Sequence, residues 1–341
     1  MTERKLRSRI RVLTTGGTIA GRANDASDST NYTAGSLTGA DLLAACPALN
    51  DIAELEIEEI AATDSKDMTL PLALDLACRV RALDESFMNA ESDAPVGIVI
   101  THGTDTMEET AFLIALTTSP HLPVILTGAM RPSTAYSADG VRNLLDAVIL
   151  ADNMDMIAYG PLLVMNGKIS MAGKARKGAT TSTAAFSTQA IGEIIDPHVF
   201  IDRAFERDYE TPPVFDAAVL KLLLEKKGLP RVPILYAYQG DDGALVDAAV
   251  AQGAKGIVYA GFGNGALSAA AEKAVLRAVG AGIPVLRATR ESSGIVTPRA
   301  LDERLGTLPG ISWSPAQLRV FLTLASLMDY TREDMKRFLG I

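Results

Sequence analysis

VGIVITHG, residues 96–103, is a continuous apolar run that ends in a threonine, a histidine and a glycine. Strands buried on both faces of a parallel sheet have this pattern, because neither face is polar. A helical pattern follows in TMEETAFLIALTT, residues 106–118, and another buried strand in LPVILTGAM, residues 122–130. This alternation predicts an α/β fold with a doubly wound parallel sheet and right-handed crossovers.

The same alternation extends in both directions along the chain. Strand-like runs are RIRVLTTGG (9–17), ELEIEEIAA (54–62) and GPLLVMNG (160–167), and helical patterns occupy residues 38–49, 70–87 and 138–152. A charged, proline-containing stretch over residues 202–231 interrupts the pattern, and strand-like runs resume with VPILYAY at residue 232. We therefore predict an N-terminal α/β domain over residues 1–203, a linker over 204–230 and a smaller C-terminal α/β domain over 231–341.

The composition excludes several classes of function. The chain has 341 residues, of which 48% are hydrophobic, and a net charge of −9. This acidic balance argues against nucleic-acid binding, which needs clustered lysine and arginine. No apolar run is long enough to cross a membrane, and no signal-peptide core precedes the first strand, so we predict a cytoplasmic protein.

The cysteines and histidines give little support for a metal site. Cys46 and Cys78 lie in apolar helical contexts, which favours buried free thiols, with a single disulfide as the alternative. The three histidines are far apart in the sequence, and no CxxC pair occurs. We therefore expect no metal ion.

The candidate site follows from where parallel sheets bind their ligands, which is outside the carboxyl ends of the strands. Four predicted strand ends carry polar clusters, and these are TTGGT, ATDSKD, THGTDT and TGAMRPS. The first continues as TTGGTIAG, residues 14–21, which fits neither the dinucleotide fingerprint nor the phosphate loop. A polar loop over residues 22–35, here called the lid loop, follows it, and its length is typical of a functional lid.

Thr18 on this turn can be a nucleophile, because a hydroxyl attacks once a base and an oxyanion site support it. The loop supplies Tyr32 as a proton relay, and HGTDT supplies Thr104, Asp105 and backbone N–H groups. A lysine can act as the base, and the candidates are Lys168, Lys174 and Lys177. Considered by themselves, such hydroxyl-rich loops are also ordinary turn formers.

A resemblance decides between these readings. TTGGTIAG, NYT, DSKDM, THGTDTMEETA, GAMRPSTAYSADG, ARKGATTSTAAF and GFGNG occur in this order over nearly the whole chain. Together they resemble the bacterial L-asparaginase/glutaminase family. The resemblance implies hydrolysis of a side-chain amide to a carboxylate and ammonia, without metal or organic cofactor. It makes Thr18 the primary nucleophile, forming an acyl-enzyme, and Tyr32 its assistant from the lid.

The resemblance also assigns the remaining site residues. Thr104, Asp105 and Lys177 match the second catalytic group of the family, in which the lysine makes a threonine hydroxyl easier to deprotonate. Ser65 would bind the α-carboxylate of the substrate and Asp105 its α-ammonium. The remaining matching positions in the substrate pocket are Lys66, Gly103 and Ala129. The family assembles as tetramers built from intimate dimers, so a homo-oligomer is implied, with a small-molecule amide as substrate.

This sequence departs from the family pattern at three positions. Lys66 stands where a glutamine is usual, Ala266 where a polar residue is usual, and Leu301 near the place of a glutamate. A lysine has three donors and no acceptor for an α-ammonium. An ω-amide that lacks or masks the α-amine is therefore the alternative substrate. Otherwise Lys66 turns to solvent or pairs with Asp302 or Glu303, and asparagine still binds.

A non-catalytic amino-acid sensor is the less favoured alternative, because a binding protein needs no nucleophile. Structural roles are expected for several other residues near the motifs. We expect His102 to be a hydrogen-bonded core residue and Asp139 a helix cap. Arg131 and Ser133 are expected to shape the turn around the site, and Lys174 and Arg176 to be solvated loop charges.

Overall fold

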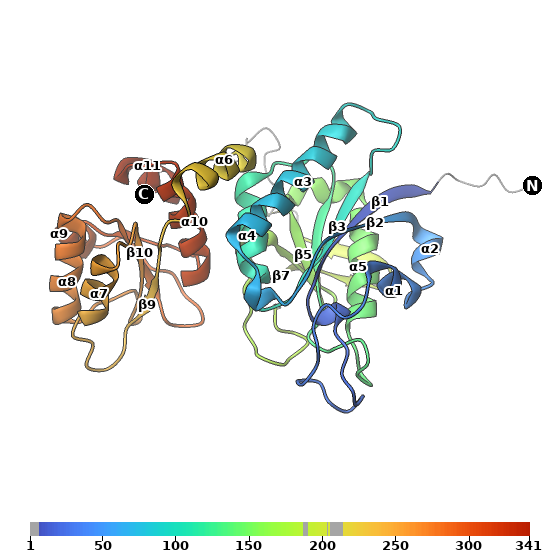
Figure 1. Cartoon of the computed structure of the whole chain (residues 1–341), viewed down its shortest axis with the longest axis horizontal. Helices are drawn as coiled ribbons and strands as arrows, with labels where there is room; N and C mark the ends of the chain where they lie inside the picture. The colour runs from blue at the N-terminus through green and yellow to red at the C-terminus, as the bar shows by residue number, and fades with distance from the viewer. Residues whose placement is uncertain (1–6, 187–189, 203, 205–213) are drawn as a thin grey trace, which may run out of the picture. The chain divides into compact units, whose positions relative to one another are not determined.

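The computed structural model describes residues 7–186, 190–202, 204 and 214–341, which fold into two compact units (Figure 1). The N-terminal unit comprises residues 1–217 and the C-terminal unit residues 218–341. A helix, α6 (Ala217–Lys227), lies within the stretch predicted as a linker. Its lysines at the carboxyl end, Lys226 and Lys227, complement the helix dipole. The linker boundaries at 204 and 230 stay a prediction.

The N-terminal unit is built on an eight-stranded sheet of order β2-β1-β3-β4-β5-β6-β7-β8. Its first half is parallel, as predicted, and contains β1 (Ser8–Gly16), β2 (Ala53–Thr63), β3 (Gly97–Thr101), β4 (Val124–Thr127) and β5 (Leu162–Met165). The second half is antiparallel and contains β6 (Lys168–Met171), β7 (Ala190–Ile195) and β8 (His198–Ile201).

Three antiparallel strands extend the predicted parallel sheet at one end. Met165 pairs with Lys168, so Asn166 and Gly167 form a two-residue hairpin turn. Both turn residues have positive φ angles, 52° and 70°. Asn-Gly is the preferred pair for such a turn, because its twist matches that of the flanking strands. The sequence therefore contained a local signal for this hairpin.

Helices cover both faces of this sheet, as the double winding requires. One core joins β1 residues Ile10 and Val12 to α5 (Gly140–Ala151), α1 (Gly39–Ala44) and α2 (Leu49–Ile52). A second core joins Leu13 to α3 (Leu70–Met88) and α4 (Met107–Thr117). Successive residues of β1 thus enter opposite cores, which explains why the central strands are apolar without alternation.

The C-terminal unit has a parallel four-stranded sheet of order β12-β11-β10-β9. Its strands are β9 (Ile234–Tyr236), β10 (Ile257–Gly261), β11 (Val285–Thr289) and β12 (Leu308–Pro309). Its helices are α7 (Ala244–Ala251), α8 (Ala269–Gly280), α9 (Ala300–Leu305), α10 (Pro315–Leu327) and α11 (Arg332–Leu339). Helices α7 and α8 pack into one core with β10, and α10 contacts β10 and β11.

Two further expectations concern the two cysteines and membrane-spanning helices. Cys46 and Cys78 are both free thiols, and Cys46 is buried, so the disulfide alternative is wrong. Within the described ranges, no helix is long and apolar enough to cross a membrane.

Candidate active site

Two strand ends meet at the carboxyl edge of the N-terminal sheet. Gly16 is the last residue of β1 and Gly17 follows it, and their φ angles are 96° and 80°. A Cβ on Gly17 would lie 2.4 Å from the Cα of Gly103, which follows β3. Only glycine combines this backbone conformation with so close an approach. The tight turn delivers Thr18 at the start of a short 3₁₀ helix, η1 (Thr18–Ala20), beside the loop that carries Thr104.

Thr18 is paired with the tyrosine of the lid loop. The Thr18 and Tyr32 hydroxyl oxygens are 2.6 Å apart, and Thr18 is only 7% exposed. Gly21 makes room for this contact, because a Cβ there would lie 2.8 Å from the Tyr32 ring. The lid returns to its base through a bridge between Arg22 and Thr33. The structure therefore brings Tyr32 and Thr18 into contact, as an assisting role for Tyr32 would require.

Hydrogen bonds within the lid loop order it, and hydrogen bonds from Ser133 hold its base. The Asp28 carboxylate accepts hydrogen bonds from the backbone N–H groups of Thr30 and Asn31, which lowers the pKa of Asp28 to about 2. Ser133 donates from its N–H and its hydroxyl to the carbonyl of Gly21, at 3.0 and 2.7 Å. The expectation that Ser133 shapes the turn around the site is confirmed.

A second group of polar side chains follows β3 on the same edge. Lys177 Nζ lies 3.0 Å from Thr104 Oγ1 and 2.6 Å from an Asp105 oxygen. Of the other two candidate lysines, Lys168 pairs with Glu193 on β7, and Lys174 is exposed. Geometry thus selects Lys177 among the three, which residue chemistry alone had left open.

The predicted substrate-binding residues lie around these groups. Ser65 Oγ accepts the backbone N–H of Asp105 at 3.1 Å, and a Cβ on Gly103 would lie 2.7 Å from that oxygen. The Ser65 carbonyl also accepts the Thr106 hydroxyl at 2.6 Å. Ala129 is 1% exposed and belongs to the core, so the structure does not expose this predicted binding residue to a ligand.

Lys66 is held by two neighbouring carboxylates. Its Nζ lies 2.9 Å from an Asp64 oxygen and 2.8 Å from an Asp67 oxygen, and its side chain is 62% exposed. Hydrogen bonds to Asp67 and Asp64 raise the pKa of Lys66 above its ordinary value. The alternative of a pair with Asp302 is wrong, because both Asp302 oxygens lie 2.6 Å from Arg287 nitrogens. The alternative of a pair with Glu303 stays a prediction.

The His102 expectation is confirmed. His102 is fully buried, and burial lowers the pKa of its imidazole to about 4. Its Nδ1 lies 2.7 Å from the Gly103 carbonyl, so Nδ1 carries the proton and Nε2 accepts from the Thr110 hydroxyl at 3.0 Å.

Two structural expectations need correction. Asp139 occupies the N-cap position of α5, but its side chain makes no capping bond. Its carboxylate instead accepts the backbone N–H groups of Met130 and Arg131, and so orders the loop after β4. Arg176 is not a solvated charge, because it is half-buried, and burial lowers its pKa.

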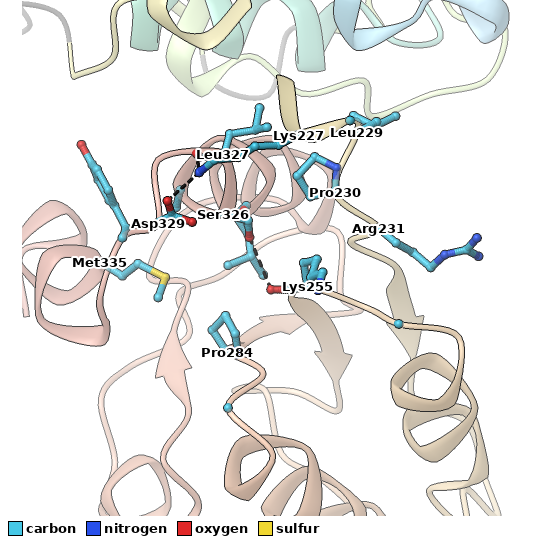
Figure 2. A pocket seen from close by; sticks show the side chains of 16 residues that line it. Lys227, Leu229, Pro230, Arg231, Lys255, Pro284, Ser326, Leu327, Asp329 and Met335 are labelled. Carbon is cyan, nitrogen blue, oxygen red and sulfur yellow. Dashed lines mark hydrogen bonds and ion pairs between the residues drawn. The ribbon is translucent and has the colours of Figure 1, made fainter. Parts of the chain in front are cut away.

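A cavity of about 500 Å³ lies in the C-terminal unit and is lined by residues of this unit alone (Figure 2). Helices α6, α7, α8 and α10 end next to it, and their terminal carbonyls carry partial negative charge. Lys227 Nζ donates to the Leu327 carbonyl at 2.8 Å and to Asp329 at 2.5 Å. The cations here offset helix ends, and no nucleophile–base pair lines the cavity, so we assign it no catalytic role.

Among residues 7–186, 190–202, 204 and 214–341, no group of three or more histidine, cysteine, aspartate or glutamate side chains could hold a metal ion. The candidate site itself brings together hydroxyls, one lysine and carboxylates. Such a set suits nucleophilic attack on an acyl carbon.

Comparison with known proteins bears on the whole chain. Residues 9–205 match the family described as "Asparaginase, N-terminal", and residues 231–339 match "Glutaminase/Asparaginase C-terminal domain". The chain is 40% identical to "L-asparaginase 2" of Bacillus subtilis, over 95% of this chain and 84% of the relative. It is 31% identical to "Glutaminase-asparaginase" of Pseudomonas aeruginosa, over 97% of this chain and 89% of the relative.

A solved structure is similar over nearly the full length. The crystal structure titled "Probable Cytoplasmic L-asparaginase" from Campylobacter jejuni has a TM-score of 0.87 and 35% identity. The match covers 98% of this chain and 99% of that one.

Proposed function

The chain belongs to the asparaginase family, and on that premise we propose that it hydrolyses the side-chain amide of L-asparagine to a carboxylate and ammonia. The observation that carries the proposal is the union of two polar groups at one sheet edge. The Thr18–Tyr32 pair and the Thr104–Lys177 pair are joined through the contact of Gly17 with Gly103. L-Glutamine is the second amide substrate that the Pseudomonas relative's name supports.

In the proposed reaction, Thr18 Oγ1 attacks the amide carbon and the C–N bond breaks. The Tyr32 hydroxyl at 2.6 Å can accept the Thr18 proton while passing its own towards the leaving nitrogen, which departs as ammonia. Water then hydrolyses the threonine ester, which releases the acid and restores Thr18. We favour Thr18 over Thr104 as the first nucleophile because Thr18 has the lid tyrosine beside it.

The second polar group, which consists of Thr104, Asp105 and Lys177, brings charged side chains to the same carboxyl edge of the N-terminal sheet. An oxygen of Asp105 lies 2.6 Å from Lys177 Nζ, so the two side chains form an ion pair at this edge. An ammonium 3.0 Å from Thr104 Oγ1 favours negative charge on that oxygen. We propose that this group holds the Thr104 hydroxyl in position, so that it orients the substrate or the incoming water. Ser65 and Asp105 are the proposed partners of the α-carboxylate and α-ammonium.

An ω-amide without a free α-amine is the second candidate substrate, and Lys66 is the observation that favours it. Its position lacks the acceptor that a glutamine would offer to an α-ammonium. Its ion pairs with Asp64 and Asp67 hold the charge in solvent, which weakens the expected repulsion and favours asparagine.

The test is ammonia release from L-asparagine, L-glutamine and succinamate, which lacks the α-amine. We expect kcat/KM for asparagine to exceed that for succinamate by more than about a hundred-fold, since succinamate cannot form the charge-assisted contact between the α-ammonium and Asp105. Equal values would establish the ω-amide alternative. Binding of asparagine without ammonia release from any amide would instead support a sensor.

Two coarser proposals accompany the function. We propose a homotetramer built as a dimer of dimers, which light scattering coupled to gel filtration would measure. A cytoplasmic location is supported by the name of the Campylobacter relative, and cell fractionation would test it.

A further inference from the structure

Lys177 contacts one short segment of the chain twice. Its Nζ binds Thr104 and Asp105, and its backbone N–H donates to Glu108 Oε2 at 2.7 Å. Residues 104–108 therefore hold both the backbone and the tip of this side chain. Glu108 lies in the first turn of α4, where the helix dipole favours a carboxylate.

The neighbours of Lys177 are held by other elements. Ala175 donates its N–H to the Met171 carbonyl, and Gly178 donates to the Ala185 carbonyl. The Lys177 N–H thus provides a direct link from this loop to α4. Arg176 is next in sequence and half-buried, and the charge of Glu108 partly offsets the effect of burial on its pKa.

We infer that Glu108 is a positioning residue, whose carboxylate fixes the backbone of Lys177 so that Nζ stays on Thr104 and Asp105. The inference rests on the proposed function, in which Lys177 acts on Thr104. A lysine side chain is a flexible four-carbon stem, so its tip is poorly localised unless its base is fixed. A displacement of about 1 Å in a catalytic group can cost up to about a hundred-fold in rate.

Two conservative variants separate the hydrogen bond from the charge. Glu108→Gln keeps the length of the side chain and a carbonyl acceptor but removes the charge. Glu108→Asp keeps the charge but is one methylene shorter, so it fails to reach the Lys177 N–H. If Glu108 positions Lys177, Glu108→Gln retains kcat within about five-fold, whereas Glu108→Asp loses about 10- to 100-fold.

The opposite order would overturn the inference. A Glu108→Asp enzyme of normal activity, with an impaired Glu108→Gln enzyme, would mean that the carboxylate serves only as counter-charge to Arg176. Glu272→Gln is the matched control, because Glu272 is also a first-turn glutamate, on α8, and its partner is Arg304 at 2.7 Å. We expect this control to leave kcat unchanged.

A double-variant cycle shows whether Glu108 acts through Lys177. In the Lys177→Met background, Glu108→Asp should cost less than about two-fold, because there is no ammonium left to position. Independent, multiplicative losses would overturn the inference. Thermal melting of each variant identifies losses that come from unfolding, and KM should change less than kcat.

The same cycle keeps the two proposals apart. If Lys177→Met by itself retains full activity, the proposed role of Lys177 fails, whatever Glu108 does. If Lys177→Met is inactive while Glu108→Asp and Glu108→Gln both equal the wild type, only the positioning inference fails.

Discussion

The carboxyl edges of the two sheets are both polar but differ in how their polar groups are used. In the C-terminal unit, Arg287 is fully buried and places two nitrogens 2.6 Å from the two oxygens of Asp302. Its remaining donors reach the carbonyls of Asn264, Gly265 and Thr297. Every N–H group of the Arg287 guanidinium has an acceptor, and both carboxylate oxygens of Asp302 accept a hydrogen bond. The network therefore stabilises the fold and has no free hydrogen-bonding group for a ligand.

The edge of the N-terminal sheet leaves polar atoms available. Lys177 is 18% exposed and its partner Asp105 is 59% exposed, whereas the C-terminal pair is almost completely buried. Thr18 is in contact with Tyr32, another hydroxyl group that can both donate and accept. The difference teaches that polar residues at strand ends indicate a site only when their hydrogen-bonding capacity remains partly unused.

The largest expected effect comes from exchanging one threonine in each of the two regions. Thr18→Ala should lower kcat/KM for asparagine by about a thousand-fold or more, because the acyl group has no acceptor oxygen. Thr307→Ala removes a buried hydroxyl that donates to Asp302 at 2.7 Å, and it should lower stability while leaving kcat unchanged. Ammonia release and thermal melting measure the two effects. Substantial activity in Thr18→Ala would contradict the proposed nucleophile.

Asp302→Asn should disrupt the buried ion pair with Arg287 in the C-terminal unit. We expect it to lower the free energy of unfolding by about 3–5 kcal/mol, because the buried Arg287 charge loses its partner. Trp313 is the chain's single tryptophan, and the centroids of its ring and the Phe338 ring, in the same unit, are 5.2 Å apart. Its fluorescence during urea unfolding therefore reports on this unit. Normal stability, or a large loss of kcat without a loss of stability, would contradict a purely structural role.

Acidification should remove the contributions of His102 and Asp302 to stability in different pH ranges. Burial lowers the pKa of His102 to about 4, whereas an unfolded histidine titrates near 6.5. The unfolded chain therefore binds the proton first, and stability falls as the pH decreases from about 6.5 to 4. Burial alone would raise the pKa of Asp302, but bonds from Arg287 and Thr307 lower it, so its contribution is lost only below about pH 4.

Melting temperatures across this range test the order of the two windows. His102→Gln should reduce the pH dependence between about pH 4 and 6.5 and leave the more acidic limb unchanged. An unchanged slope in this variant would show that other groups dominate the window.

A smaller effect is expected for the lid hydroxyl. Tyr32→Phe should lower kcat by about ten-fold, the equivalent of one hydrogen bond of about 1.4 kcal/mol. Tyr136→Phe is the matched control, because the Tyr136 N–H donates to the Ala26 carbonyl of the lid loop at 3.1 Å while the residue is 88% exposed. Steady-state ammonia release from both variants measures the contrast. Equal activities would remove Tyr32 from the proposed proton relay.

Much of the fold could be predicted from local signals. The apolar runs of β1, β3, β4 and β5 identified the parallel half of the N-terminal sheet, because strands buried on two faces lack polar alternation. The hairpin at Asn166 and Gly167 was missed although its turn signal is local. A positional rule assigned Asp139 as a cap, but its carboxylate found N–H groups in the preceding loop.

By itself the sequence determined the α/β architecture, the family and the residue types at the strand ends, because periodicity and motifs are properties of neighbouring residues. Only the tertiary structure decided which of those residues still have hydrogen-bonding capacity to use. Glu108 and Lys177 are 69 residues apart in sequence, and Thr104 and Lys177 are 73 apart. Lys66 has a side chain of the type that repels an α-ammonium, but its charge is paired with Asp64 and Asp67. Whether a polar group is saturated depends on such three-dimensional partners, and residue type does not specify them.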